Sequence, residues 1–346
     1  MSERRDVVIL GAGFSKAIYD SMPLIDELGN DCRMELTDSV LAQKHMPGIF
    51  RNGYFEIWLS RIAEDQPDYS DIRNAENHAL FLEVSWAIRK IVDQRQRVAM
   101  AAETDQGWLF DFVEKLHNRR ATVITLNYDN LIEFAVQSFE AVGRPALEGE
   151  SPSGTTKITA EMLIDHLPLL GGAPTYGSLE HAMADTFSLH KLHGSLDWWW
   201  TPGDVSGATI SRSPLVGGFG SLSDEREDEE DRKHRQPGRS PYIVPPTASK
   251  SSYFLNPQAR ELWARSAKAL SEATALTIFG YSAPVTDVVM AEMIRESTNP
   301  DCPVTVVTLD EDGVRTRLRG LGISDERVAN VFADAADGPA EFVNDF

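Results

Sequence analysis

The stretch 6–15 reads DVVILGAGFS, and it decides the fold. Its first five residues, DVVIL, are short, β-branched and bounded by glycine, which predicts a strand buried on both faces, as in a parallel sheet. Gly11 and Gly13 then allow a tight turn in which the backbone comes close to a ligand. Residues from Ser15 onward read as a helix whose N-terminus offers free N–H groups to a pyrophosphate.

The rest of the chain repeats this alternation of buried strands with amphipathic helices. Alternating strands and helices predict a doubly wound, mostly parallel, Rossmann-like α/β sheet with helical and loop insertions. Further strands are predicted at 121–126, 187–192, 275–279 and 304–309, and helices at 74–100, 106–117, 256–272 and 285–295.

Insertions account for the long intervals between these elements. We expect residues 1–346 to form one domain of this type, with a mainly helical insertion at 30–118. The segments 141–185 and 202–240 are predicted to be irregular. The first is rich in Gly, Pro and Ser, and the second contains a charge run without apolar anchors.

The composition limits which partners the chain is expected to bind and in which compartment it is expected to lie. A formal net charge of -20 opposes attraction to phosphate backbones and to anionic membranes, so neither direct nucleic-acid binding nor membrane binding is expected. Two cysteines, Cys32 and Cys302, supply neither a disulfide framework nor a four-thiolate zinc site. The first residues show no signal sequence, and a cytoplasmic location is expected.

Small and hydrogen-bonding residues follow every predicted strand. In open parallel sheets, ligands bind beyond the carboxyl ends of the strands, so these residues are expected to meet at one edge. They are Gly11-Ala12-Gly13-Phe14-Ser15, Asn127-Tyr128-Asp129, His193-Gly194-Ser195, Gly280-Tyr281-Ser282 and Asp310.

Each of these signals has a plainer structural interpretation when taken alone. The glycine turn departs from the dinucleotide fingerprint, because a third glycine would fall at Lys16, and this disfavours a hydride-transfer enzyme. Asn127 or Asp129 is equally suited to cap a helix. The feature that local capping does not explain is their occurrence together at all five strand ends.

The stretch 186–200, TFSLHKLHGSLDWWW, raises two alternatives of its own. His190 and His193 suggest a metal pair, but residues three apart on a strand face opposite sides of the sheet, so no metal site is predicted. Trp198, Trp199 and Trp200 also alternate faces, so they are interpreted as core packing plus a lid that walls in the histidine.

Five motifs in this order resemble the sirtuin superfamily, specifically its SIR2-like branch in bacterial anti-phage defence. They extend over residues 7–310 and cover most of the chain. The motifs are GAGFSKA with a following Met22-Pro23, TLNYDNLIE, KLHGSLDW, FGYSAPVTD and VVTLD.

The resemblance implies NAD as the substrate and assigns a part to each motif. The pyrophosphate is expected at Gly11, Ala12, Gly13 and Ser15, and the far ribose and adenine at Gly280, Ser282 and residues 308–310, including Asp310. The catalytic residues are expected to be His193, Asn127 and Asp129.

Two departures from deacylating sirtuins set the expected activity. The four-cysteine zinc module is missing, and the run DSMPLIDEL lacks the arginine of the sirtuin loop at this point. SIR2-like members without the zinc module hydrolyse NAD, so the resemblance implies a zinc-free NAD+ glycohydrolase that yields nicotinamide and ADP-ribose. The alternatives are an NAD- or ADP-ribose-sensing module without turnover and, third, an NAD-dependent protein deacylase.

The resemblance also implies control, since an unrestrained NAD hydrolase would poison its host. We expect a gated effector that depletes NAD in anti-phage defence, active as a homo-oligomer or with a partner. In the resembling systems that partner is a HerA-type ring ATPase or a short Argonaute, and this sequence does not choose between them.

Overall fold

The computed structural model describes residues 4–102, 106–164, 184–201, 210–220, 238–247, 256–284, 286–334 and 337–346. Its centre is a six-stranded sheet in which every neighbouring pair is parallel. In spatial order the strands are β11 (Val328–Phe332), β10 (Val304–Val307), β9 (Ala275–Phe279), β1 (Asp6–Leu10), β2 (Thr122–Thr125) and β5 (Ser188–Lys191).

This order confirms the predicted doubly wound, Rossmann-like α/β fold. Numbered by their order in the chain, the six strands lie 3-2-1-4-5-6 across the sheet. The chain therefore adds strands first on one side of β1 and then on the other, and the switch point lies between β1 and β9. Ligands bind at this switch point in such sheets. Residues 6–10 are buried throughout, as expected for a central strand. The edge strand β11 was not predicted, because two of its five residues are exposed and its pattern lacks a buried run.

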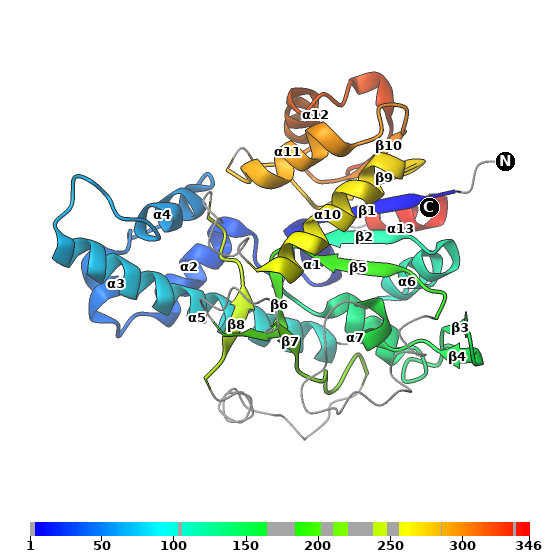
Figure 1. Ribbon diagram of the computed structural model, residues 1–346, viewed down its shortest axis with the longest axis horizontal. Helices are drawn as coiled ribbons and strands as arrows, with labels where there is room; N and C mark the ends of the chain where they lie inside the picture. Colours follow the sequence, from blue (N-terminus) through cyan, green and yellow to red (C-terminus); the bar gives the residue numbers. More distant parts are fainter. Residues whose placement is uncertain are drawn as a thin grey trace.

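Helices cover both faces of the sheet (Figure 1). On one face, α6 (Gly107–Arg119) packs against α7 (Leu131–Ser138) and α13 (Gly338–Asp345). Phe14 of α1 (Ala12–Ile18) joins this face through ring contacts with Trp108 and Phe112 of α6. On the other face, α10 (Pro257–Glu272) packs against β2, β5 and α11 (Val288–Ser297). Helix α12 (Glu311–Gly320) connects β10 to β11.

A second group of helices lies beside the sheet, at the left of Figure 1. Helix α5 (Asp71–Ala101) packs against α2 (Ile25–Glu35), α3 (Val40–His45) and α4 (Tyr54–Ile62). Its first residue follows Ser70, whose hydroxyl accepts the Arg73 N–H, and a serine there favours a helix start. No helix in the described ranges is long and apolar enough to cross a membrane.

The two segments predicted to be irregular contain short elements. Within 141–185 lie an antiparallel hairpin, β3 (Glu148–Ser151) with β4 (Gly154–Lys157), and the 3-10 turn η1 (Ala160–Leu163). Within 202–240 lies β7 (Ser211–Arg212). The remaining parts of these predictions, at 165–183, 202–209 and 221–237, fall outside the described residues.

The predicted strand at 187–192 ends early, and a second strand follows it directly. After β5, a two-residue turn leads into β6 (Gly194–Trp200), which pairs with β7 and with β8 (Ser240–Ile243) in a separate antiparallel sheet. Gly194 permits this change of sheet, since its φ is +80° and a Cβ there would lie 2.0 Å from the Tyr242 carbonyl oxygen. His193 therefore lies in the turn between two sheets.

Candidate functional site

The strand ends meet at one level of the sheet. Leu10 is in register with Phe279 on one side and Thr125 on the other, and Thr125 with Lys191. Backbone bonds continue one residue further, from Gly11 N–H to the Phe279 carbonyl and from Leu126 N–H to the Leu10 carbonyl. The loops that carry the predicted site residues consequently leave the sheet side by side.

At the switch point, glycines allow the loops after β1 and β9 to touch. The Gly13 N–H donates to the Gly280 carbonyl at 2.9 Å. A Cβ on Gly11 would lie 2.6 Å from that oxygen, and a Cβ on Gly280, whose φ is +64°, would lie 2.1 Å from the Phe14 nitrogen. These glycines thus serve close packing between the two loops. Helix α1 begins at Ala12, earlier than the predicted start at Ser15.

Ser15, Asn127 and Asp129 form one connected hydrogen-bonded cluster beside this turn. The Ser15 hydroxyl donates to Asp129 Oδ2 at 2.6 Å and accepts from Asn127 Nδ2 at 2.9 Å. The other carboxylate oxygen of Asp129 accepts the Leu131 N–H at 3.3 Å, so the helix-capping alternative holds for that oxygen. Ser15 and Asp129 are buried, and Ser15 orients the other two side chains.

The Asn127 amide has a defined orientation. Its Nδ2 donates to the Gly11 carbonyl at 2.9 Å as well as to Ser15. A carbonyl oxygen only accepts, so the NH₂ end must face Gly11. Both amide hydrogens are engaged, and the Asn127 carbonyl oxygen is the end available to accept a bond from water or a hydroxyl.

His193 is held in place by contacts of both its backbone and its imidazole ring. Its carbonyl accepts the Val244 N–H at 2.9 Å, and the Val244 carbonyl accepts from the Tyr128 hydroxyl at 2.8 Å, next to Asn127. The imidazole is buried, with Nε2 lying 4.0 Å from Asp287 Oδ1. The Trp263 ring of α10 lies 6.3 Å away, centroid to centroid.

A phenol links the histidine to the glycine turn. The Tyr281 hydroxyl donates to Asp287 Oδ2 at 3.3 Å, while the Cα of Tyr281 lies 2.6 Å from the ideal Cβ position on Gly11. Burial, with the Asp287 carboxylate next in importance, raises the pKa of Tyr281 well above its ordinary value. Tyr281 therefore remains a protonated donor, and contacts run continuously from His193 to Gly11.

The predicted adenosine end is more open. Ser282 and Asp310 are exposed, as is Ala12 of the glycine turn. Arg317 of α12 joins the first two, donating to the Ser282 carbonyl and, at 2.9 Å, to Asp310 Oδ2. The Arg317 guanidinium is the main cause of a lowered pKa at Asp310, and the Gly313 N–H adds to it.

A buried ion pair lies beneath the Asn127–Asp129 turn. Lys191 Nζ donates to the Asp129 carbonyl at 2.6 Å and to Glu133 Oε1 at 2.8 Å, and both side chains are almost fully buried. Asn130 Nδ2 lies within hydrogen-bond distance of three acceptors, on Glu133, Ser195 and Asp197. Burial raises the pKa of Glu133, and the Lys191 charge opposes that shift. This network holds the turn from below.

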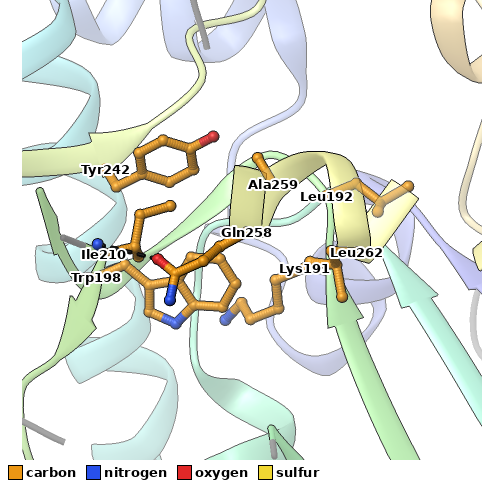
Figure 2. A pocket seen from close by; sticks show the side chains of 8 residues that line it. All are labelled: Lys191, Leu192, Trp198, Ile210, Tyr242, Gln258, Ala259 and Leu262. Carbon is orange, nitrogen blue, oxygen red and sulfur yellow. Dashed lines mark hydrogen bonds between the residues drawn. The ribbon is translucent and has the colours of Figure 1, made fainter. Parts of the chain in front are cut away.

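A small cavity lies behind Lys191, between β6 and α10 (Figure 2). It has room for little more than a water molecule. Trp198 and Tyr242 line it from the small sheet, Ile210 from the residue before β7, and Gln258 and Leu262 from α10. None of the predicted site residues lines this cavity.

Of the three consecutive tryptophans, Trp198 and Trp200 contact Tyr242 within the small sheet, whereas Trp199 packs against α5. Trp198 stacks on Tyr242, and Trp199 lies beneath the Arg89 guanidinium, 4.9 Å from the ring centroid. The indole beside His193 is Trp263, which the sequence did not single out. Among the described residues, no group of three or more His, Cys, Asp or Glu side chains is placed to hold a metal ion.

The structure thus brings the glycine turn, the Ser15 cluster and His193 to one edge and adds residues to which the sequence analysis assigned no role, although Tyr281 was among the residues expected at a strand end. Tyr281 and Asp287 both lie in the FGYSAPVTD stretch, and Lys191 lies in KLHGSLDW. Their presence in those stretches was a usable signal. Trp263 and Arg317 carried none, since each lies on a helix outside the strand ends.

Comparison with known proteins gives distant similarities. No family model and no curated protein matches the chain. One similar solved structure, described as "Structural Basis for the Mechanism and Regulation of Sir2 Enzymes", shares 11% identity, with 99% of this chain and 92% of that chain covered, at a TM-score of 0.38. Another, "Sir2-p53 peptide-NAD+", shares 12% identity over 99% and 94%, at 0.39.

At that level the similarity carries no argument about activity. The strand order and the residues at the switch point define a Rossmann-type α/β protein with a polar site at the carboxyl edge of the sheet. Its chemistry has to be argued from those residues.

Proposed function

We propose that the chain binds NAD at this edge and hydrolyses the bond between nicotinamide and ribose. The observation that carries the proposal is that the Gly11 turn lies at the sheet's switch point, with the Ser15–Asn127–Asp129 cluster and the turn that carries His193 beside it on the same carboxyl edge. The motif resemblance to SIR2-like proteins supports the same substrate.

The nucleotide would extend along the strand ends. Its pyrophosphate would lie at Gly11, Ala12 and Gly13. The exposed Ser282 and Asp310, with Gly280, would take the far ribose and adenine. Ser15 acts here through Asp129 and Asn127, because its hydroxyl is bonded to both.

The reaction needs three functions at the nicotinamide ribose. As the C1′–N1 bond breaks, its electron pair goes to nicotinamide, and the Asp129 carboxylate offsets the positive charge that develops on the ribose. The Asn127 carbonyl oxygen orients the attacking water. His193 takes the proton that water loses as its oxygen bonds to C1′. The products are nicotinamide, ADP-ribose and a proton.

Control of this activity is part of the proposal. We place the chain among gated effectors of anti-phage defence that act as homo-oligomers or with a HerA-type ATPase or a short Argonaute. The support is the motif resemblance and the cost to a cell of constant NAD loss. Activity should then rise with protein concentration or with the partner present.

Chromatography of NAD incubated with the purified chain, over a range of concentrations and with candidate partners, tests the proposal. We expect nicotinamide and ADP-ribose from the wild type, and a loss of at least about 100-fold in His193→Ala and in Asn127→Ala. His78→Ala, at an exposed histidine on α5, is the matched control and should keep full activity.

Three results would contradict the proposal. Full turnover in both site variants removes those residues from the mechanism. Calorimetric binding of NAD without nicotinamide release under any condition supports the sensing module. Formation of acetyl-ADP-ribose from NAD and an acetylated peptide supports the deacylase. Circular dichroism of each variant confirms that its fold is intact.

A further inference from the structure

Asp287 occupies the N-cap of α11 but does not cap that helix. An aspartate at this position normally accepts an N–H from the first helical turn. Here its side chain makes no such bond, and the Ala291 N–H of the helix donates to the Asp287 backbone carbonyl instead. The carboxylate is directed elsewhere.

The direction it takes is toward His193. Asp287 Oδ1 lies 4.0 Å from His193 Nε2, and Asp287 Oδ2 accepts the Tyr281 hydroxyl at 3.3 Å. The two side chains of the acid–imidazole pair are 5% and 8% exposed. Taking a carboxylate out of water is costly unless it is paired or hydrogen-bonded, and here the Tyr281 hydroxyl bonds to Asp287 while the imidazole lies beside it.

Residues of α10 and α4 also lie around the His193–Asp287 pair. Trp263 of α10 covers one side of the imidazole. From the helical group, Glu56 of α4 accepts the Thr286 hydroxyl, one residue before Asp287. In the part of the chain that the structure describes, the titratable groups found on this side of the imidazole include Asp287 and, behind it, Tyr281 and Glu56.

We propose that Asp287 is the positioning residue for His193 in the reaction, held in place by Tyr281. This inference rests on the proposed function. When His193 takes the proton from the attacking water, the imidazolium that forms lies against the Asp287 carboxylate, which stabilises it. Asp287 stays ionised throughout. The proton leaves His193 for solvent once ADP-ribose has formed.

The test compares Asp287→Asn with Asp287→Glu, Tyr281→Phe and a control, Glu292→Gln. Asparagine preserves the shape of the side chain and removes its charge. Glu292 is an exposed acid on the same helix, so its neutralisation should leave the activity at the wild-type level. The readouts are kcat and KM for NAD and an NMR titration of the His193 ring in the full chain.

We expect Asp287→Asn to lower kcat on the order of 100-fold, with little change in KM. The pKa of His193 should fall by about one unit, because an adjacent anion no longer favours the imidazolium. Asp287→Glu should recover part of both values. Tyr281→Phe should change them in the same direction by a smaller amount.

Wild-type kcat together with an unchanged His193 titration in Asp287→Asn would overturn the inference. If that variant does not fold, the same two results in Tyr281→Phe overturn it. The titration also separates this inference from the proposed function. A wild type that never releases nicotinamide defeats the proposed function, and the contact with His193 then stands or falls on the titration alone.

Discussion

At the scale of single residues, the site depends on side chains that orient one another. Ser15 holds both Asp129 and Asn127, and the Asn127 amide is fixed by the Gly11 carbonyl. Such second contacts decide whether a catalytic group is held in a productive geometry. The three glycines of the switch point, Gly11, Gly13 and Gly280, act differently: because they have no side chain, the two loops can pack closely.

Gly280 gives the sharpest prediction of this kind. Gly280→Ala should destabilise the protein by about 2 kcal/mol or more, because alanine at a φ of +64° is strained and its methyl group would lie 2.1 Å from the Phe14 nitrogen. Chemical denaturation measures the change. Gly320→Ala is the control, since nothing lies within 4 Å of that position and its φ is not positive. Equal stability of both variants would contradict the close packing of the loops.

At the scale of elements, the ion pair between β5 and α7 supports the Asn127–Asp129 turn. Lys191 leaves the end of β5 and reaches both the Asp129 carbonyl and Glu133 of α7. A buried pair of this kind contributes little net stability as a pair, but losing one partner leaves an uncompensated charge.

Lys191→Met should therefore cost about 3–5 kcal/mol at neutral pH, and the double variant with Glu133→Gln should recover most of it. Without Lys191, the pKa of Glu133 rises further above its unfolded value. The deficit should narrow as pH falls, because protonating Glu133 removes the buried charge, and it should return as pH rises through that pKa. Urea titrations at several pH values measure this. A deficit that stays constant with pH, or no recovery in the double variant, would contradict the account.

How far the sequence predicted these elements depended on how each one is buried. The strands at 6–10 and 275–279 were predicted to the residue, since continuous apolar runs mark central strands. The change of sheet at Gly194 was missed, because an alternating run through His193 does not reveal which sheet each half joins. The sequence did not predict contacts that depend on tertiary packing. An example is the contact of His193 with Trp263 on α10.

At the scale of the whole molecule, the two helical regions have different relations to the site. Helix α10 lies on the sheet and carries Trp263, and α11 packs against α10 and begins just after Asp287. Helix α4 of the separate helical group reaches the same place through Glu56, which accepts the Thr286 hydroxyl. A change in the packing of the helical group would therefore shift Thr286 and with it Asp287, which lies next to His193.

A crystal structure of the His193→Ala protein with NAD bound tests the central claim most directly, because this variant should hold the substrate uncleaved. We predict the pyrophosphate at Gly11–Gly13 and the nicotinamide ribose between Asn127, Asp129 and position 193. A nucleotide bound elsewhere, or one whose nicotinamide end points away from position 193, would contradict the account.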